Sequence, residues 1–573
     1  MSLNTQTFNL PKRLMPDVEL TLKEWQEKGK VKRLWAKDAS LWTNNDEAKW
    51  LGWLSIIERQ LADKKKFADF ISQVKADGFS HILLLGMGGS SLCPEVLSFT
   101  FGQQDDFPEL HILDSTDPAQ IRAVEAKIDL KNTLFFVSSK SGSTLEPNIF
   151  FQYFFERVSQ TIGKEKAGSR FVAITDPNSK LQKIAEDNGF RDIIFGDPEI
   201  GGRYSALSNF GMIPLAAMGI DTADFLERAN KMVEACQNEN VYKNPGVVLG
   251  VILGTAARDF GRDKVTIITS PAIYDLGAWL EQLIAESTGK KGKSLIPVDR
   301  EEIVSGEIYG CDHMFVYLKV AGDDQKDAEF EKLEKSGHPV VRIVLPEILN
   351  LGQEFFRWEI AVAVAGAVME INPFSQPDVE ASKIVTKKLT SEYEEKGNLP
   401  EETPIFEAGG IRLFTDEHNA EVLRKAVGND RTLENFINAH LDRIKKNDYF
   451  GLLAYLEMNR ENETVLQEIR HSILKSERVA TCLGFGPRFL HSTGQGYKGG
   501  ANNGVFLQIT CDDAEDLKVP NQKYTFGTVK AAQARGDFEV LAERKRRALR
   551  VHLGTDVKKG LSQMGQMITK RGN

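Results

Sequence analysis

Residues 135–147 join the end of a buried strand to a dense group of hydroxyl side chains. Two phenylalanines and a valine lead into residues 139–144, which supply four hydroxyls, one lysine and one glycine, and an amphipathic segment follows at 148–158. Backbone N–H groups and hydroxyls at a helix start form a compact oxyanion pocket that the helix dipole favours. An ordinary capped turn is the alternative, because Ser and Thr are common N-caps. Four hydroxyls and a lysine exceed what capping needs, so we interpret the segment as a seat for the phosphate of a small metabolite.

A glycine-rich loop follows the first apolar run of the chain. Residues 81–85 (HILLL) lead into GMGGSS at 86–91, and glycines let a backbone approach a ligand closely. A dinucleotide fingerprint is the alternative, since Asp114 ends the next apolar run, where a ribose-binding acid would lie. The sixth position is Ser91 rather than glycine, however. The second hydroxyl loop, at Ser139, also fits one small sugar phosphate better than a long dinucleotide.

Two further segments carry side chains suited to moving a proton and to holding the charge that results. In GGRYS (201–205), two glycines precede Arg203, whose permanent positive charge suits a group that develops negative charge. Gln282 and Glu286 lie four apart, hence on one face of a helix expected at 276–287, and a carboxylate there could act as a proton-transfer base beneath a substrate. Glu281 lies on a different face and is expected in solvent. Taken singly, a structurally paired Arg or a surface Glu is the ordinary interpretation, so these residues gain weight from one another.

The elements expected around these residues form two βα series. Apolar runs alternate with stretches long enough for crossover helices, first at 81–85, 110–113, 133–137 and 171–174, then at 264–268, 314–318 and 340–344. Near-continuous apolar strands that alternate with helices predict parallel sheets buried on both faces. We therefore expect an α/β fold with two related lobes, although no residue-level repeat proves a duplication.

Segments of different character flank the two lobes. The N-terminal arm, residues 1–65, is expected to be helical, and its tryptophan-rich side is expected to pack on the body rather than to bind a ligand. A polar stretch with Gly and Pro at 396–402 marks a boundary. Beyond it lie two helical stretches, strand-like segments, and a basic helix at 545–550 whose charges are expected in solvent. The predicted domains are the helical arm (1–65), two lobes (66–228 and 229–400) and a C-terminal α/β extension (401–573).

The composition excludes several classes of protein. The 573 residues are 41% hydrophobic and 27% charged, which is typical of a globular protein with a large core. A net charge of −9 without a long basic block argues against a nucleic-acid partner. No apolar run reaches membrane-spanning length, and residues 1–13 lack the apolar centre of a signal peptide. Five scattered cysteines without CxxC spacing predict neither a disulfide framework nor a zinc site, so a cytoplasmic enzyme fits best.

Five segments, taken in order, resemble the phosphoglucose isomerase family, whose members are built from two sugar-isomerase (SIS) lobes. They are GGSS (88–91), SSKSGSTLEP (138–147), GGRYSALSNFG (201–211), QLIAESTGK (282–290) and INPFSQPDVEASK (371–383). Each motif is weak, but their order and spacing make the resemblance specific. The chain looks most similar to the isomerase half of bifunctional transaldolase–phosphoglucose isomerases, which also resembles residues 33–38 and 486–495. No stretch has room for a transaldolase barrel, so we infer the isomerase alone. The expected fold is thus two SIS-type doubly wound parallel-sheet lobes between the arm and the extension.

The resemblance implies glucose-6-phosphate isomerase activity, the reversible conversion of glucose 6-phosphate to fructose 6-phosphate through a cis-enediolate in glycolysis and gluconeogenesis. Glu286 matches the base that moves a proton between C2 and C1, Arg203 the residue that stabilises the enediolate, and Lys383 the ring-opening lysine. The implied substrate contacts are Gly89, Ser90, Ser139, Lys140, Ser141, Thr144, Gln282 and Gln376. The implied partner is a small-molecule sugar phosphate, with no cofactor, no metal, no nucleic acid and no membrane.

One departure from the family pattern concerns the histidine that helps to open the sugar ring. Typical members carry it in a Gly-x-x-Gln-His-like segment between the Glu and Lys motifs, and they borrow it from a neighbouring subunit. Between Glu286 and Lys383 this chain has only His313 and His338, in no such context. The nearest echo is His491, followed by Thr-Gly-Gln at 493–495. We predict that His491 opens the ring, from its own chain or from the partner in a homodimer, with His313 or a water as the alternative.

Three other functions stay open at the level of sequence. A SIS-type module that binds a sugar phosphate without catalysis would keep the hydroxyl loop yet would not need Glu286. A nicotinamide enzyme would use the glycine-rich loop for NAD. Activity on mannose 6-phosphate depends on the shape of the pocket around C2, which the sequence does not reveal.

Overall fold

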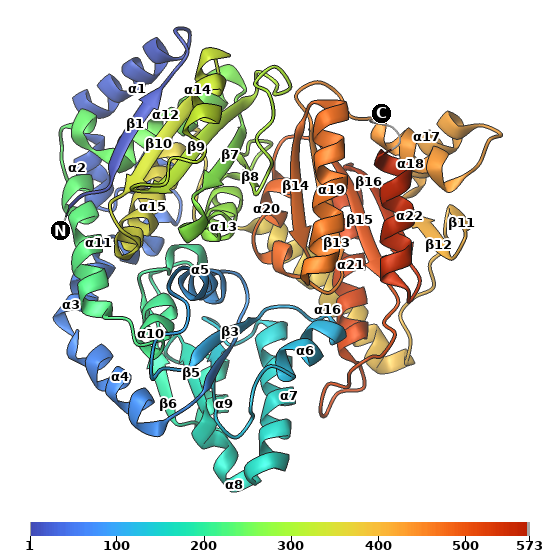
Figure 1. The fold of residues 1–573 in the computed structure, drawn as a ribbon, viewed down its shortest axis with the longest axis horizontal. Helices are drawn as coiled ribbons and strands as arrows, with labels where there is room; N and C mark the ends of the chain where they lie inside the picture. Colours follow the sequence, from blue (N-terminus) through green and yellow to red (C-terminus); the bar gives the residue numbers. More distant parts are fainter. Residues whose placement is uncertain (1, 570–573) are drawn as a thin grey trace.

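Three sheets organise the chain, each flanked by helices (Figure 1). The computed structural model describes residues 2–569. The first sheet is wholly parallel, in the order β3-β2-β4-β5-β6. β4 and β5 are buried along their whole length, as the continuous apolar runs predict for a parallel sheet. The strands are β2 (His81–Leu85), β3 (Glu109–Leu113), β4 (Thr133–Ser138), β5 (Phe171–Thr175) and β6 (Asp192–Phe195).

The order of the first sheet opens a crevice between β2 and β4. The connection after β2 runs through α5 (Leu92–Phe101) to β3 on one side, whereas the connection after β4 runs through α7 (Leu145–Ile162) to β5 on the other. Connections that leave in opposite directions make a gap at the carboxyl ends of the two strands, which is where doubly wound sheets bind ligands. The two loops singled out in the sequence, 86–91 and 139–144, begin at these ends and therefore lie side by side.

The second sheet repeats the order of the first and adds a strand from the N-terminus. Its order is β1-β10-β9-β7-β8, with the four later strands parallel. The helices that position the site are α12 (Pro245–Phe260), α13 (Leu276–Thr288) and α15 (Leu351–Val368). The parallel strands are β7 (Lys264–Thr269), β8 (Ile296–Asp299), β9 (His313–Val320) and β10 (Val340–Leu345). The predicted α/β class with parallel sheets is confirmed.

The N-terminal arm is not helical throughout. Residues Thr5–Asn9 form β1, which pairs antiparallel with Val340–Val344 at the edge of the second sheet. This short segment (TQTFN) is mostly exposed and has no apolar alternation, so pairing with the edge strand β10 decides its structure. The rest of the arm is helical, with α1 (Met15–Glu27), α2 (Lys30–Trp35), α3 (Ile56–Ala62) and the start of α4 (Lys65–Asp77).

The tryptophans of the arm mostly pack on the body, as predicted. Trp25 and Trp53 are fully buried. The indole of Trp35 donates to the carbonyl of Cys236, and that of Trp42 to the carbonyl of Ala363. Trp50 is the exception, since it borders the main cavity described below.

The C-terminal extension contains a third sheet built to the same plan. Its order is β11-β12-β16-β15-β13-β14. The four parallel strands are arranged β14-β13-β15-β16, which matches β3-β2-β4-β5 in the first sheet and β8-β7-β9-β10 in the second. The sequence indicated only an α/β extension. The strands are β11 (Phe406–Ala408), β12 (Ile411–Phe414), β13 (Tyr449–Tyr455), β14 (Ala480–Phe485), β15 (Gly504–Cys511) and β16 (Arg547–Leu553).

The prediction of a basic helix at 545–550 is wrong. Most of this segment belongs to β16, and Arg546 and Arg550 are buried. The side chains of β16 alternate between two covered faces, and one face takes Leu549 and Val551 into the core of the third sheet. The prediction was wrong because it was based on the high proportion of Lys and Arg in this segment. A strand that carries arginines on a buried face can have the same proportion.

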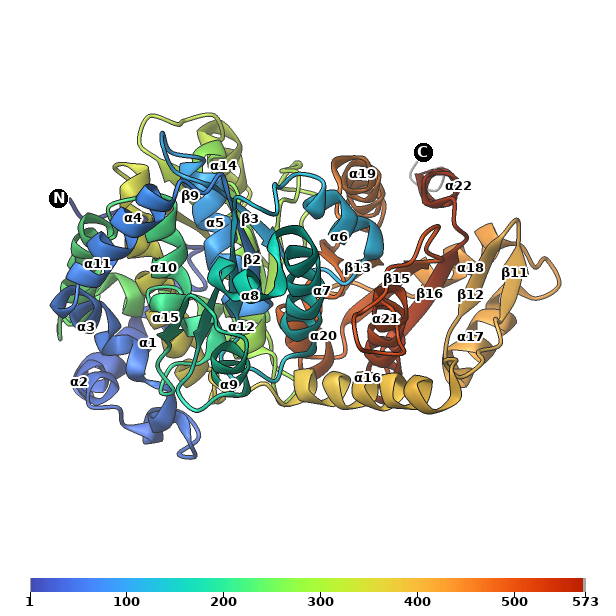
Figure 2. The ribbon, with the colours of Figure 1, turned by 90° about the horizontal axis from the view of Figure 1, so that it is seen from below.

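Two long helices join the third sheet to the rest. α16 (Pro377–Lys396) runs from the second lobe along the lower side of the molecule and packs against α21 (Phe526–Glu543), as Figure 2 shows. The polar stretch expected as a boundary follows α16 directly. The domain limits 66, 229 and 401 stay predictions. Among the helices of residues 2–569, none combines the length and the apolar character that crossing a membrane requires.

Candidate active site

A cavity of about 1260 Å³ opens at the crevice between β2 and β4. It is lined by residues of three lobes, where each lobe is one of the three sheets with its flanking helices. The loops after β2 and β4 form one wall, and α13, the start of α16 and the turn 488–491 form the other. All twelve residues predicted from the sequence line this cavity: Gly89, Ser90, Ser139, Lys140, Ser141, Thr144, Arg203, Gln282, Glu286, Gln376, Lys383 and His491. Their proximity is a fact of the structure, whereas the role of each stays a prediction.

The hydroxyl loop has donors that the rest of the chain does not use. The hydroxyls of Ser138 and Ser139 are buried without a hydrogen-bond partner among the described residues. Thr144 is the N-cap residue of α7, but its side chain makes no capping hydrogen bond to the described chain. The loop is therefore not an ordinary capped turn. Free hydroxyls at the N-terminus of an 18-residue helix are what an oxyanion would need.

Lys140 belongs to this loop and is already paired. Its Nζ lies 2.9 and 2.7 Å from the two carboxylate oxygens of Asp176 and donates to the carbonyl of Asp197 at 2.9 Å. Burial raises the pKa of Asp176 despite the opposing charge of Lys140. The lysine thus contributes positive charge at the edge of the loop, and a direct bond to a ligand would require it to share its proton donors with Asp176.

Glycines let the loop after β2 pack against the opposite wall. A Cβ on Gly89 would lie 2.0 Å from the carbonyl oxygen of Gly202, and Gly88 has a φ of +55°. A Cβ on Gly88 would also meet the amide of Gln282 at 2.8 Å. Close approach of backbones is therefore the structural reason for these glycines, and it holds Ser90 at the floor of the cavity.

Glu286 lies buried between a cation and an amide. Its carboxylate is 3.3 Å from Nη1 of Arg203 and accepts a hydrogen bond of 3.1 Å from Nε2 of Gln282. Gln282 also donates to the backbone carbonyl of His491 at 2.7 Å. Because the Gln and the Glu are one helical turn apart on α13, the helix aims both side chains into the cavity.

Arg203 is fixed by every N–H group that it has. Nε donates to Ser287, Nη2 to the carbonyls of Pro373 and Ser375, and Nη1 to Gln376 at 3.0 Å while facing Glu286. The residue is only 3% exposed. It therefore offers a rigid positive charge rather than a spare donor, and it ties the turn before α16 to α13.

His491 reaches the cavity from the third lobe of the same chain. Its Nε2 donates to a carboxylate oxygen of Glu146 at 3.0 Å, and the same oxygen accepts from Nε2 of Gln533 at 2.6 Å. Burial would raise the pKa of Glu146, but the charge and hydrogen bond of His491 outweigh burial and lower it. With its Nε2 hydrogen held by an ionised carboxylate, the imidazole presents Nδ1 as its other nitrogen. The cavity thus acquires a histidine without a partner subunit.

His313, the alternative histidine, lies elsewhere. It is fully buried at the amino end of β9, where Nδ1 lies 3.2 Å from Asp312 and the ring packs against Tyr309. It does not line the main cavity. The structure therefore favours His491 over His313 as the histidine beside a bound sugar.

Gln376 lies deeper in the main cavity than Lys383. Gln376 precedes α16 and is held by Arg203, whereas Lys383 lies at the rim, with its side chain 43% exposed and its Nζ donating to Glu380 at 2.9 Å. Lys383 thus lines the cavity at its rim and has donors beyond the one that Glu380 accepts.

Three residues that hold the turn 488–491, which ends at His491, were not predicted from the sequence. Glu146 and Gln533 support the imidazole ring, and Arg488 anchors the turn to the first lobe. Both Nη atoms of Arg488 donate to Glu95 at 2.7 and 2.6 Å, and Nε lies 2.8 Å from Asp114. Glu146 could have been predicted, because it lies only two positions after the hydroxyl loop. The contacts of Arg488 span nearly four hundred positions and leave no local signal.

The partners of Asp114 bear on the dinucleotide alternative. Its carboxylate accepts from Arg488 and from the hydroxyl of Ser91 at 3.1 Å. A ribose-binding acid must offer a free carboxylate to two hydroxyls, so Asp114 serves the interface between lobes instead.

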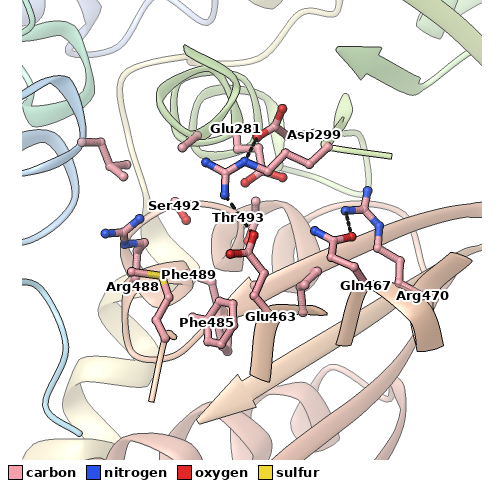
Figure 3. Close-up of a pocket in the computed structure, with 16 residues that line it drawn as sticks. Glu281, Asp299, Glu463, Gln467, Arg470, Phe485, Arg488, Phe489, Ser492 and Thr493 are labelled. Atoms are coloured by element: carbon pink, nitrogen blue, oxygen red, sulfur yellow. Dashed lines mark hydrogen bonds and ion pairs between the residues drawn. The ribbon is translucent and has the colours of Figure 1, made fainter. Parts of the chain in front are cut away.

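A second, small cavity of about 70 Å³ lies behind the histidine turn and α13 (Figure 3). Glu281 and Asp299 line one side, while Arg488, Ser492 and Thr493 line the other. The expectation that Glu281 is solvated is wrong. Burial, reinforced by the charge of Asp299, raises the pKa of Glu281 to about 8. The third lobe covers this face of α13, which the sequence of the helix alone could not reveal.

One group of side chains that could hold a metal ion occurs among the described residues, where the sequence showed no cluster. His81, Glu109 and His111 have ligand atoms within 4.8 Å of one another. They lie toward the amino ends of β2 and β3, at the opposite edge of the sheet from the main cavity. The main cavity is lined by hydroxyl, amide and charged side chains. Among residues 2–569, no group of three possible metal ligands lies close together in this cavity.

Comparisons with known proteins show which chains this one is similar to. The family model for phosphoglucose isomerase matches residues 58–318. Glucose-6-phosphate isomerase of Methanocaldococcus jannaschii is 28% identical over 353 residues, 55% of this chain and 85% of that protein. A probable glucose-6-phosphate isomerase of Methanococcus maripaludis is 30% identical over 355 residues, 53% of this chain and 77% of that protein.

Two solved structures resemble the fold. A hypothetical protein of Thermus thermophilus has a TM-score of 0.57 and 24% identity, covering 67% of this chain and 99% of that one. A glucose-6-phosphate isomerase of Chlamydia trachomatis has a TM-score of 0.52 and 21% identity, covering 64% of this chain and 78% of that one. At these identities the likeness concerns the fold alone.

Proposed function

Because this chain belongs to the phosphoglucose isomerase family, we propose that it interconverts glucose 6-phosphate and fructose 6-phosphate. The observation that carries the proposal is the buried arrangement of Glu286, Arg203 and Gln282 facing a hydroxyl loop with unused donors. A module that only binds sugar phosphate would need the loop but not a buried carboxylate opposite it. The proposed setting is glycolysis and gluconeogenesis in the cytoplasm.

In the proposed reaction, the phosphate sits on the hydroxyl loop at the N-terminus of α7. Ser139, Ser141 and Thr144 hold it there, and this binding energy positions the far end of the sugar. Ring opening needs a proton delivered to the ring oxygen and one removed from the C1 hydroxyl. His491, oriented by Glu146, is placed to exchange a proton through Nδ1, and Lys383 at the rim is the second candidate.

Isomerisation then needs one base. The Glu286 carboxylate removes the proton from C2 of the open aldose, and the C–H electron pair forms the C1=C2 double bond of the enediolate. Charge gathers on the former carbonyl oxygen, where the fixed cation Arg203 lowers its energy. Return of the proton to C1, with transfer of the O2 hydrogen to O1, gives the ketose. Atoms and electrons balance without an added reductant or oxidant.

Glu286→Gln tests the proposal directly. The amide keeps the size and the hydrogen bond to Gln282 but cannot accept the C2 proton, so turnover should fall by about 10³-fold or more while sugar-phosphate binding persists. A coupled isomerase assay and calorimetric titration measure the two effects. Glu281→Gln, five residues earlier and on another face of α13, is the matched control and should retain turnover at neutral pH. Near-normal turnover in Glu286→Gln would reject the assignment.

A further inference from the structure

The third sheet borders a cavity of its own. This cavity of about 300 Å³ is lined by β12, the carboxyl halves of β15 and β16, α21 and the loop 401–402. Tyr455 lies at the end of β13, Thr510 and Asp512 at the end of β15, and His552 on β16. The cavity shares no lining residue with the main cavity.

An incompletely neutralised arginine lies in the wall of this cavity. Arg550 is 3% exposed, and its guanidinium lies 4.5 Å from the ring centre of Phe414 and 5.5 Å from that of Phe538. Its Nε is buried without a hydrogen-bond partner in the described part of the chain. Burial lowers the pKa of Arg550, and the positive charges of Arg535 and Arg412 lower it further against the opposing effect of Glu402. Arg412 and Arg535 line the same cavity as Arg550, together with the carboxylates of Glu401, Glu402 and Asp512.

The chain's own Glu402 stands where these cations meet. Its carboxylate lies 2.8 Å from Nε of Arg535 and 2.7 Å from Nη2 of Arg550. Glu402 follows α16 on an exposed loop, with its side chain 32% exposed. Arg412, by contrast, pairs with Asp512 at 3.1 Å. One solvent-accessible carboxylate thus neutralises two arginines, and it marks the point at which an incoming anion would bind.

Lys530, which also lines the cavity, is different. It is 3% exposed but lies 2.8 Å from Asp117 and 2.5 Å from Asp513, so two acids satisfy it. Lys530 therefore pins α21 to the first lobe and leaves the arginines as the anion-seeking groups.

We propose that this cavity is a second anion site, which binds the phosphate group of a small hydroxylated metabolite in place of the Glu402 carboxylate. Arg535 and Arg550 form planar forks that suit a phosphate. Asp512 and Glu401 at the margin accept hydrogen bonds from hydroxyl groups beside that phosphate. The volume is at the small end of the range for ligand pockets, which favours a ligand no larger than a sugar phosphate.

A ligand in this site would contact the same helix that supports the catalytic histidine. α21 supplies Lys530, Ala534 and Arg535 to this cavity and Gln533 to the main one, where Gln533 donates to Glu146. The inference does not depend on the proposed reaction, since it rests on charges and contacts of the third lobe.

Equilibrium dialysis of the full chain with inorganic phosphate tests the proposal. The wild type should bind two equivalents. Thr144→Val, in the hydroxyl loop, should lose one equivalent, and Arg535→Gln should lose the other. Glu402→Gln removes the tethered competitor and should tighten the second equivalent several-fold. Arg424→Gln, which alters an exposed arginine paired with Glu417 in the same lobe, is the matched control and should leave both unchanged.

Three results would overturn the second site: one equivalent in the wild type, a second equivalent that Arg535→Gln leaves intact, or no tightening in Glu402→Gln. Arg535 is half-buried at the rim, so its variant is expected to fold, and thermal melting checks this. An inactive wild type that binds two equivalents would reject the isomerase while leaving the second site in place.

Discussion

Single residues in the main cavity are fixed in pairs of opposite character. Glu286 faces Arg203, and His491 faces Glu146, each within 3.3 Å. The first pair places a proton acceptor beside a fixed positive charge. The second pair gives the imidazole a defined tautomer, because an ionised carboxylate accepts only from a protonated nitrogen. The proposed base, Glu286, and the proposed ring-opening group, His491, therefore lie on different lobes.

Glu146→Gln should slow turnover of the closed sugar. The amide can no longer orient the imidazole as an anion does, and loss of an orienting carboxylate costs about 10–100-fold. Steady-state kcat with glucose 6-phosphate measures the effect, and turnover of an open-chain analogue should change little. Glu125→Gln, whose carboxylate bonds Tyr153 and Arg157 away from the cavity, is the control. Equal losses on both substrates would contradict the ring-opening role.

Glu281 should make folding stability depend on pH. Its pKa of about 8 lies above the ordinary value of 4.5, so the folded state binds the proton more tightly than the unfolded state. The contribution of Glu281 to the free energy of unfolding is then complete below the ordinary pKa of 4.5, and it is lost as pH rises through about 8. The charge of Asp299 opposes ionisation of Glu281, whereas the charges of Arg470 and Arg300 favour it.

Thermal melting between pH 6.5 and 9 measures this dependence. The wild-type Tm should fall by a few degrees across the range, and Glu281→Gln should flatten the curve. An unchanged slope in the variant would show that another group titrates there.

At the scale of elements, the turn 488–491 is a short 3-10 helix that a buried ion pair cluster ties to the first lobe. Arg488 is the only residue of this turn that contacts both Glu95 of α5 and Asp114 after β3 among the described residues. The anchor joins the third lobe to the first, and the histidine follows three positions later. Placement of His491 therefore depends on a buried ion cluster.

Arg488→Met should disturb both stability and catalysis. Removal of one partner leaves two buried carboxylates uncompensated, which costs about 3–5 kcal/mol. Turnover of the closed sugar should also fall, because the turn loses its anchor. Denaturant unfolding and kcat measure the two effects. Glu95→Gln keeps an acceptor for the arginine and should be milder in both; wild-type values in Arg488→Met would exclude an anchoring role.

The elements that could be predicted from the sequence are those with local signals. Apolar runs such as 133–137 gave the buried parallel strands, and the density of hydroxyls at 139–144 gave the loop. The strand Thr5–Asn9 could not be predicted, since only its pairing with β10 makes it a strand. Burial of Glu281 and the contacts of Arg488 depend on the third lobe, whose position no local pattern encodes.

At the scale of the whole molecule, three sheets share one strand order, and all three lobes supply residues to the main cavity. The first lobe gives the hydroxyl loop, the second gives Glu286, and the third gives His491. The sequence predicted the first two lobes, because their apolar runs are regular. The third was expected only as an α/β extension, since the basic residues of β16 were interpreted as a helix.

A cavity assembled within one chain makes a prediction about the homodimer that the resemblance implies. If members of the family borrow a histidine across the dimer, dilution into monomers abolishes activity. Here His491, Glu146 and Gln533 belong to one chain, so a monomer should retain its specific activity. Sedimentation velocity over a dilution series gives the assembly state, and a coupled assay on the same samples gives kcat. Specific activity should stay constant through any dimer-to-monomer transition. A decline that follows the loss of dimer would mean that the partner subunit completes the site, and the role assigned to His491 within its own chain would be wrong.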